Sequence, residues 1–162
     1  MTEDARFEDA GGRPVALKAL DAEDLKVIAA LCQDAVFPAS EMKWDRARRR
    51  FAVLLNRFRW EESGGPTRPE RVQSLLAVED VLKVASQGVS RDDSDLVLSL
   101  LTLDWEPGED GTGRVTLVLA GDGGVAVDVE ALEVTLKDVT QPYAAPSGKA
   151  PGRYWPGWKP RP

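Results

Sequence analysis

The sequence predicts an α+β domain in which an N-terminal amphipathic helix packs on a mainly antiparallel β-sheet, or on a partly closed barrel or roll, of about six to eight strands. Two observations support this fold class: one stretch has a helical period, and a series of β-patterned runs follows it, separated by turn residues. The chain has 162 residues, of which 43% are hydrophobic, the size and content of one ordinary domain. We expect this domain to span 14–140, between a flexible leader, 1–13, and an extended or disordered tail, 141–162, that is rich in proline and aromatic residues.

The helix is expected at about 21–35. Asp21 is a plausible N-cap, and Asp24 adds an acid to the first turn, where the helix dipole favours negative charge. Apolar residues then recur at spacings of three and four, as on one face of an amphipathic helix. They are Leu25, Ile28, Ala29, Cys32 and Ala35.

A β-hairpin is predicted over roughly 36–60, with its turn around 45–48. In "FAVLLNRFRW", the large side chains of Phe51, Val53 and Leu55 alternate, but Phe58 and Trp60 follow one step out of phase. An extra residue at Asn56-Arg57, forming a β-bulge, would restore the phase. Since both faces of this strand are largely apolar, we expect it to lie in the centre of the sheet.

Further strands are expected after the Gly/Pro-rich break at 62–70, in the runs 71–88, 95–105 and 113–139. The sequence "GDGG" at 121–124 lies between two β-patterned segments and predicts a hairpin turn. The segment 131–139 is ambiguous, because its valines and leucines fit a strand that enters a bulge and also a short closing helix.

Composition excludes several chemistries. The chain has no histidine and a single cysteine, Cys32, so a histidine base, a Cys/His zinc site and an internal disulfide are ruled out. Cys32 lies on the apolar helix face, where a thiol is usually inert. The polar, acidic N-terminus is unlike a signal peptide, and the longest apolar run, 96–103, is too short to span a bilayer, so we expect a cytoplasmic protein without a membrane segment. No cofactor is expected.

Two loop motifs contain residues of the types found in ligand sites. The acids of "DWEPGEDGTG" at 104–113 are of the type that binds calcium, but their spacing matches no EF-hand and the glycines and proline indicate a hairpin turn. "GDGG" is followed by a strand rather than by the helix N-terminus that a phosphate loop requires. We therefore expect no metal site and no phosphate cradle.

Charge is distributed unevenly along a chain whose net charge is -6. Residues 43–60 carry 7 basic and 1 acidic side chain, whereas 61–140 carry 6 basic and 17 acidic ones. The arginines suit phosphate contacts. They equally suit a hairpin whose exposed ends are solubilised by arginines that pair with an acidic body, and this interpretation is favoured. Asn56 is interpreted as satisfying the bulge backbone rather than as forming a site with Arg57 and Arg59.

Three segments, "RRRFAVLLNRFRWE", "VLSLLTLDWEPG" and "VTLVLAGDGGVAVDVEALEVTLKDV", together resemble an uncharacterised bacterial family that is known only as a domain of unknown function. The resemblance covers about 15–143 and implies a single compact domain in a bacterial cytoplasm, without an assigned activity. The tail that is rich in proline and tryptophan departs from the family pattern.

The leading functional hypothesis is a non-enzymatic protein-binding or scaffold module that holds a partner protein, or a second copy, through a sheet edge, the basic hairpin or the aromatic tail. A nucleic-acid-binding protein that uses the basic hairpin 43–59 is the alternative, and an enzyme is the third class. The candidate interaction surface comprises Arg46, Arg48, Arg49, Arg57, Arg59, Trp155 and Trp158.

Overall fold

The computed structural model describes residues 14–58, 70–89, 96–140 and 143–144. Within these ranges it contains one α-helix and eleven strands, so the predicted α+β class is confirmed and the expected six to eight strands are too few. The elements are β1 Ala16–Ala19, α1 Ala22–Cys32, β2 Ala35–Pro38, β3 Met42–Asp45, β4 Arg50–Phe58, β5 Glu70–Val78, β6 Val81–Gln87, β7 Val97–Pro107, β8 Gly113–Leu119, β9 Gly124–Val129, β10 Val134–Asp138 and β11 Tyr143–Ala144. Single 3-10 turns lie at Ala39–Glu41 and Glu109–Gly111.

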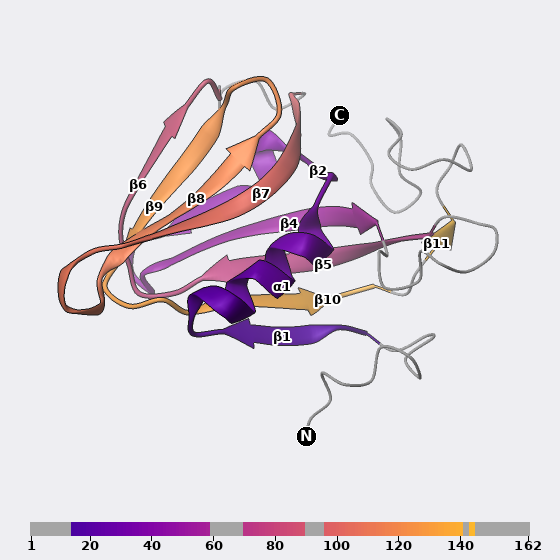
Figure 1. Ribbon diagram of the computed structural model, residues 1–162. Coiled ribbons are helices and arrows are strands. Elements are labelled where there is room, and N and C mark those ends of the chain that lie inside the picture. Colours follow the sequence, from indigo (N-terminus) through magenta and orange to yellow (C-terminus); the bar gives the residue numbers. More distant parts are fainter. Residues whose placement is uncertain (1–13, 59–69, 90–95, 141–142, 145–162) are drawn as a thin grey trace.

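The strands form one bent antiparallel sheet in the order β1-β10-β5-β4-β2-β7-β8-β9-β6, with β3 beside β4 and β11 beside β5. Figure 1 shows β1, β10, β5 and β4 in one layer, β7, β8, β9 and β6 in a second, and α1 across the opening between β7 and β1. Among the described strands, β1 and β6 do not pair with each other, so the sheet is not a closed barrel. One hydrophobic core fills the space between the layers and under the helix.

The helix α1 begins directly after Asp21, the predicted N-cap. The backbone N–H of Asp24 donates to Oδ1 of Asp21 at 2.9 Å, and Leu25 and Ile28 are buried. The helix ends at Cys32, three residues before the predicted end, because Asp34 has a left-handed backbone (φ 64°) and Ala35 already belongs to β2.

Strand β4 is central, as predicted, because β5 pairs with one of its edges and β2 and β3 share the other. The predicted hairpin is present as β3–β4 over 42–58, while 36–41, expected in its first arm, belong to β2 and a 3-10 turn. The predicted bulge is wrong: the register with β5 runs without interruption from Phe51 opposite Val78 to Phe58 opposite Arg71. Side chains therefore keep alternating, and Arg57 shares the inward face with Leu55.

The C-terminal half consists of further hairpins. Strands β8 and β9 pair across the predicted "GDGG" turn, in which Gly121 (φ 82°) and Asp122 (φ 68°) have the left-handed backbone that such a turn requires. The stretch 134–138, ambiguous in sequence, is strand β10 and pairs with both β1 and β5. Tyr143 and Ala144, in the region predicted to be extended or disordered, form β11 beside Arg71 and Glu70.

Candidate functional site

A buried ion pair lies inside the sheet. Nη2 of Arg57 donates to both carboxylate oxygens of Asp138 at 3.1 Å, and the two side chains are 0% and 2% exposed. The Ser74 hydroxyl completes the cluster by donating to Oδ1 of Asp138 at 2.6 Å and accepting from Nε of Arg57 at 3.0 Å. The expectation that the arginines are exposed is thus wrong for Arg57, because the unbulged strand directs its side chain inward.

This cluster joins three strands, β4, β5 and β10, and the chain segment before β1. The backbone N–H of Val15 donates to Oδ2 of Asp138 at 2.8 Å, and the Asp138 N–H donates to the Val15 carbonyl at 2.9 Å. Cys32 lies near the pair: burial raises the pKa of its thiol to about 12, against an opposing effect of the Arg57 charge. A neutral thiol and a mutually neutralised ion pair are structural groups, so we assign the cluster to stability rather than to catalysis.

The exposed arginines of the described hairpin are Arg46, Arg48, Arg49 and Arg50, and three of them pair with acids. Arg49 pairs with Glu130 at 2.5 Å, and Arg50 pairs with Glu79 at 3.0 Å. Arg48 lies 3.9 Å from Asp45 within its own turn. The remaining one, Arg46, lies over the ring of Trp44, 5.9 Å from its centroid.

Other predicted site residues have different positions. Asn56 is buried on β4, on the face opposite Arg57, and its backbone carbonyl accepts a hydrogen bond from Nη1 of Arg71 at 3.0 Å. Its assignment to a bulge is wrong, because the register with β5 is uninterrupted. Arg59, Trp155 and Trp158 lie outside the described residues. The described part of the chain contains no cluster of acids and Cys able to hold a metal ion.

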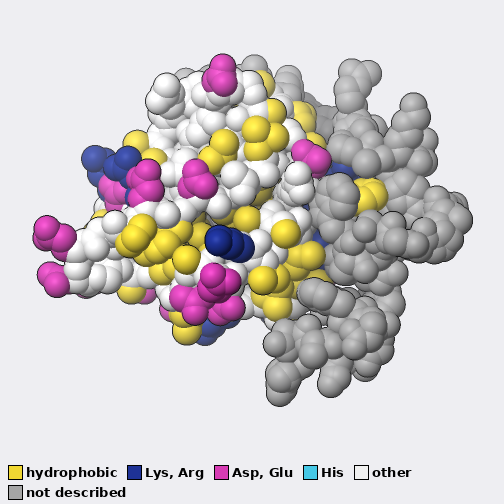
Figure 2. Space-filling model, viewed as in Figure 1, with side chains coloured by type: hydrophobic (Ala, Val, Ile, Leu, Met, Phe, Trp, Pro, Cys, Tyr) yellow, Lys and Arg dark blue, Asp and Glu magenta, His cyan; other side chains and the backbone are white. Residues whose placement is uncertain are grey.

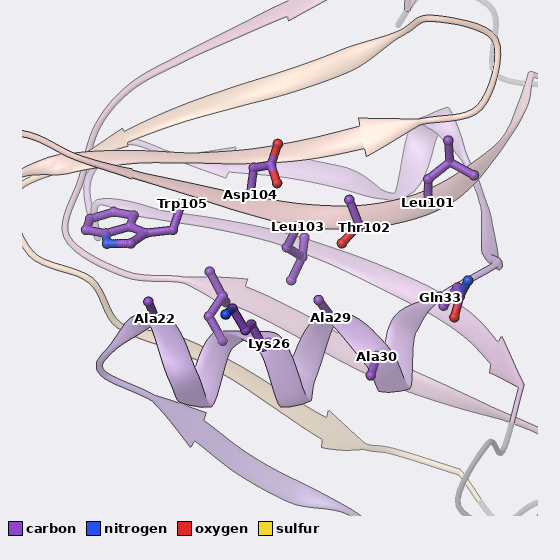
Figure 3. A pocket seen from close by; sticks show the side chains of 11 residues that line it. Ala22, Lys26, Ala29, Ala30, Gln33, Leu101, Thr102, Leu103, Asp104 and Trp105 are labelled. Carbon is purple, nitrogen blue, oxygen red and sulfur yellow. The ribbon is translucent and has the colours of Figure 1, made fainter.

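A groove between α1 and β7, which the sequence did not indicate, encloses about 530 Å³ (Figure 3). Trp105 and Ala22 lie at one end of the groove, and Leu101 and Gln33 lie at the other. The helix lines it with three alanines, a leucine and a lysine, and the strand lines it with five consecutive residues. The full lining is Ala22, Leu25, Lys26, Ala29, Ala30, Gln33, Leu101, Thr102, Leu103, Asp104 and Trp105.

The strand wall of this groove is an open sheet edge. Strand β7 pairs with β2 only from Val97 to Leu100, because β2 is four residues long, and it pairs with β8 as far as Pro107. Among the described strands, none pairs with 101–107 on the side away from β8. Five consecutive residues line the groove since an edge presents the backbone itself, together with side chains from both faces of the strand.

The groove combines apolar contacts with polar positions on both walls. Leu103 points from β7 toward α1, whereas Asp104 points away from the helix (Figure 3). Leu101 is 42% exposed at one end, and Trp105 is half-buried at the other. Figure 2 shows hydrophobic side chains gathered across this face of the molecule, with acidic side chains around them. The arrangement offers a backbone edge and apolar contacts but no nucleophile with an adjacent base.

The comparison with protein families gives one result. Residues 15–153 match the model of a family described as a protein of unknown function, DUF2948, and the chain belongs to this family. The resemblance to a family known only as a domain of unknown function is confirmed, and the match extends ten residues beyond the expected boundary at 143. Neither the comparison with curated proteins nor that with solved structures gave a match. No helix in the described part of the chain is long and apolar enough to cross a membrane.

Proposed function

We propose that this domain is a protein-binding module that takes up an extended segment of a partner protein in the groove between α1 and β7. The observation that carries the proposal is the open edge of β7 opposite a helix whose groove-facing residues include Ala22, Ala29 and Ala30. Backbone groups on the open edge of a strand hydrogen-bond to an added strand, and neighbouring side-chain contacts supply selectivity. The small alanine side chains leave room for the partner between the two walls.

Charge defines the kind of segment that fits. With its cap residue, α1 carries the acids Asp21, Glu23 and Asp24 against one base, Lys26, and β7 adds the acids Asp104 and Glu106. Of these acids only Asp104 lines the groove, and the others adjoin lining residues in the sequence. An incoming segment with apolar side chains toward Leu101 and Leu103, flanked by lysine or arginine that meet these acids, complements the groove. Electrostatic complementarity of this kind favours encounter and the choice of partner.

The structure makes the alternative, a nucleic-acid grip through the basic hairpin, less favourable. Arg57 is buried, and Arg49 and Arg50 are paired with acids. Phosphate binding would have to displace these pairs in a chain whose net charge is -6. The proposal therefore rests on the sheet edge rather than on the arginines.

The test uses the full chain and a short fluorescein-labelled peptide in which valine and leucine alternate with lysine. We expect saturable binding by fluorescence anisotropy, and slower hydrogen exchange of the 101–105 amides when the peptide is bound. Leu101→Asp should weaken binding at least about tenfold, because a carboxylate replaces the apolar contact at one end of the groove.

Val27→Asp is the matched control. Val27 is 46% exposed on α1 against 42% for Leu101, yet it does not line the groove, and the change in charge is the same. Its affinity should stay within about twofold of that of the unmodified chain. Equal losses in both variants, or unchanged exchange at 101–105 on binding, would refute strand addition at β7.

A further inference from the structure

A second groove lies beside β6, at the other end of the strand order from β1. It encloses about 440 Å³ and is lined by Trp44, Arg46 and Arg49 from the β3–β4 hairpin and by the consecutive residues 81–84 of β6. Strand β6 pairs with β9 on one side, and among the described strands none pairs with it on the other. This groove therefore also has one strand edge as a wall, and it shares no lining residue with the groove between α1 and β7.

Arg49 fixes the relation between the two walls. Its carbonyl accepts from the backbone N–H of Val81 at 3.0 Å, and its side chain pairs with Glu130 just beyond β9. The hairpin turn is thus attached to the start of β6, and the remaining cations of the lining are Arg46 from the hairpin and Lys83 from β6. Their positions are set by the backbone, so the cationic character of the groove is built into the fold.

The lining is cationic and apolar in an otherwise acidic molecule. It contains three basic residues and no carboxylate, although the net charge of the chain is -6. Leu82 is 55% exposed, and Trp44 is half-buried under the guanidinium of Arg46. Glu130 already pairs with Arg49, and Asp128, the residue opposite Lys83 on β9, already pairs with Arg114, so Arg46 and Lys83 supply the charge for a ligand.

We infer that this groove is a second docking site, which takes an acidic extended peptide segment whose apolar or aromatic side chain rests on Leu82 and Trp44. Carboxylates on either side of that apolar side chain meet Arg46 and Lys83, and the open edge of β6 supplies backbone hydrogen bonds. A peptide fits better than a lone small anion, because the lining offers four consecutive strand residues and exposed apolar surface. The site is independent of the groove at β7.

The test is fluorescence anisotropy with a short labelled peptide in which glutamate alternates with valine and tyrosine, and with the same peptide carrying lysine for glutamate. The acidic peptide should bind to the groove at β6, with an affinity that falls as sodium chloride is added. The double variant Arg46→Glu and Lys83→Glu should weaken its binding at least about tenfold, because like charges then face each other. Leu82→Ser, which leaves the charge unchanged, should weaken it about threefold or more.

The matched control is the double variant Lys18→Glu and Lys137→Glu, which changes the net charge equally on exposed residues of β1 and β10. It should bind the acidic peptide within about twofold of the unmodified chain. An equal loss in the control, or no binding of the acidic peptide, would overturn the inference. Leu101→Asp separates the two proposals: acidic-peptide binding that survives this change supports a separate site at β6, whereas a loss of more than about tenfold would show that both peptides share the groove at β7.

Discussion

Arg57 on β4 and Asp138 on β10 are 81 residues apart in the sequence. Their guanidinium and carboxylate groups form a buried ion pair over β5, the strand between them. Both are essentially inaccessible to solvent, and Ser74 and the Val15 amide occupy the remaining acceptor positions of the carboxylate. Such a pair is costly to desolvate and contributes little net stability, but the loss of one partner leaves a buried charge without compensation.

Asp138→Asn is therefore expected to destabilise the domain by about 3–5 kcal/mol, although the side chain keeps its shape. Combining it with Arg57→Met should restore part of the loss, since the uncompensated guanidinium is then absent. Urea unfolding of both single variants and the double variant measures this coupling. A loss below about 1 kcal/mol in Asp138→Asn would mean that water reaches the pair.

Leu55→Ala should cost about 2–5 kcal/mol, because Leu55 is fully buried on the inward face of β4. Arg48→Ala, in the neighbouring turn, should change the free energy of unfolding by less than about 0.5 kcal/mol, since its ion pair is long and exposed. The two variants are compared by urea unfolding. Similar losses would place Arg48 in a buried network and contradict its exposed position.

Cys32 should be unreactive in the folded protein. Burial raises the pKa of its thiol from 9.0 to about 12, so the reactive thiolate is scarce at neutral pH. A thiol reagent such as Ellman's reagent should label Cys32 slowly in native buffer and rapidly in guanidinium chloride. Rapid labelling of the native protein would contradict burial of the thiol.

The same shift links Cys32 to stability at high pH. Because the pKa is higher in the folded state, the contribution of the neutral thiol is fully present below about pH 9 and is lost as the pH rises toward about 12. The free energy of unfolding should be measured for the unmodified chain and for Cys32→Ala across this pH window. As the pH rises, the unmodified chain should lose stability relative to the variant. A difference that is constant with pH would refute the shift.

The pKa of Asp128 should lie below its ordinary value of 3.8, because Nε of Arg114 donates a hydrogen bond to its carboxylate at 2.7 Å. The stabilising effect of this pair is present above about pH 3.8 and is lost as the pH falls through the folded-state pKa. Side-chain NMR titration measures this pKa, which should rise in Arg114→Ala. No change in that variant would show that the exposed pair does not persist in solution.

Local signals in the sequence predicted the elements whose cause is local. Asp21 identifies the helix start because a cap acts within one turn, and "GDGG" identifies a hairpin because its backbone needs residues that tolerate positive φ. The predicted number of strands was too low because β1, β2 and β3 have only four residues each. Strands so short carry little periodic pattern.

The buried ion pair was missed for a different reason. A bulge that brings Phe58 and Trp60 into phase turns Arg57 outward, whereas uninterrupted alternation from Phe51 places Arg57 inward. Asp138 occupies the corresponding inward position after Val134 and Leu136 on β10. The signal in the sequence was a pair of opposite charges, each at an inward-facing position of an otherwise apolar strand.

The grooves at β7 and β6 depend on tertiary structure. The open edge of β7 exists because β2 begins only at Ala35, opposite Leu100, and the chain before it forms α1 beside the rest of β7. No pattern within 97–107 indicates which strand pairs with β7 or where that pairing stops. The proposed sites were therefore outside the reach of sequence reasoning.

The position of Asp138 also constrains how the chain folds during synthesis. It lies 123 residues after Val15, and β10 is the strand that pairs with β1. A ribosome releases the N-terminal segment first, so β1 has no strand to pair with and Arg57 has no carboxylate until the last part of the domain emerges. Pairings so distant in sequence are slow to form, and we expect the sheet to be completed after translation rather than strand by strand as the chain emerges.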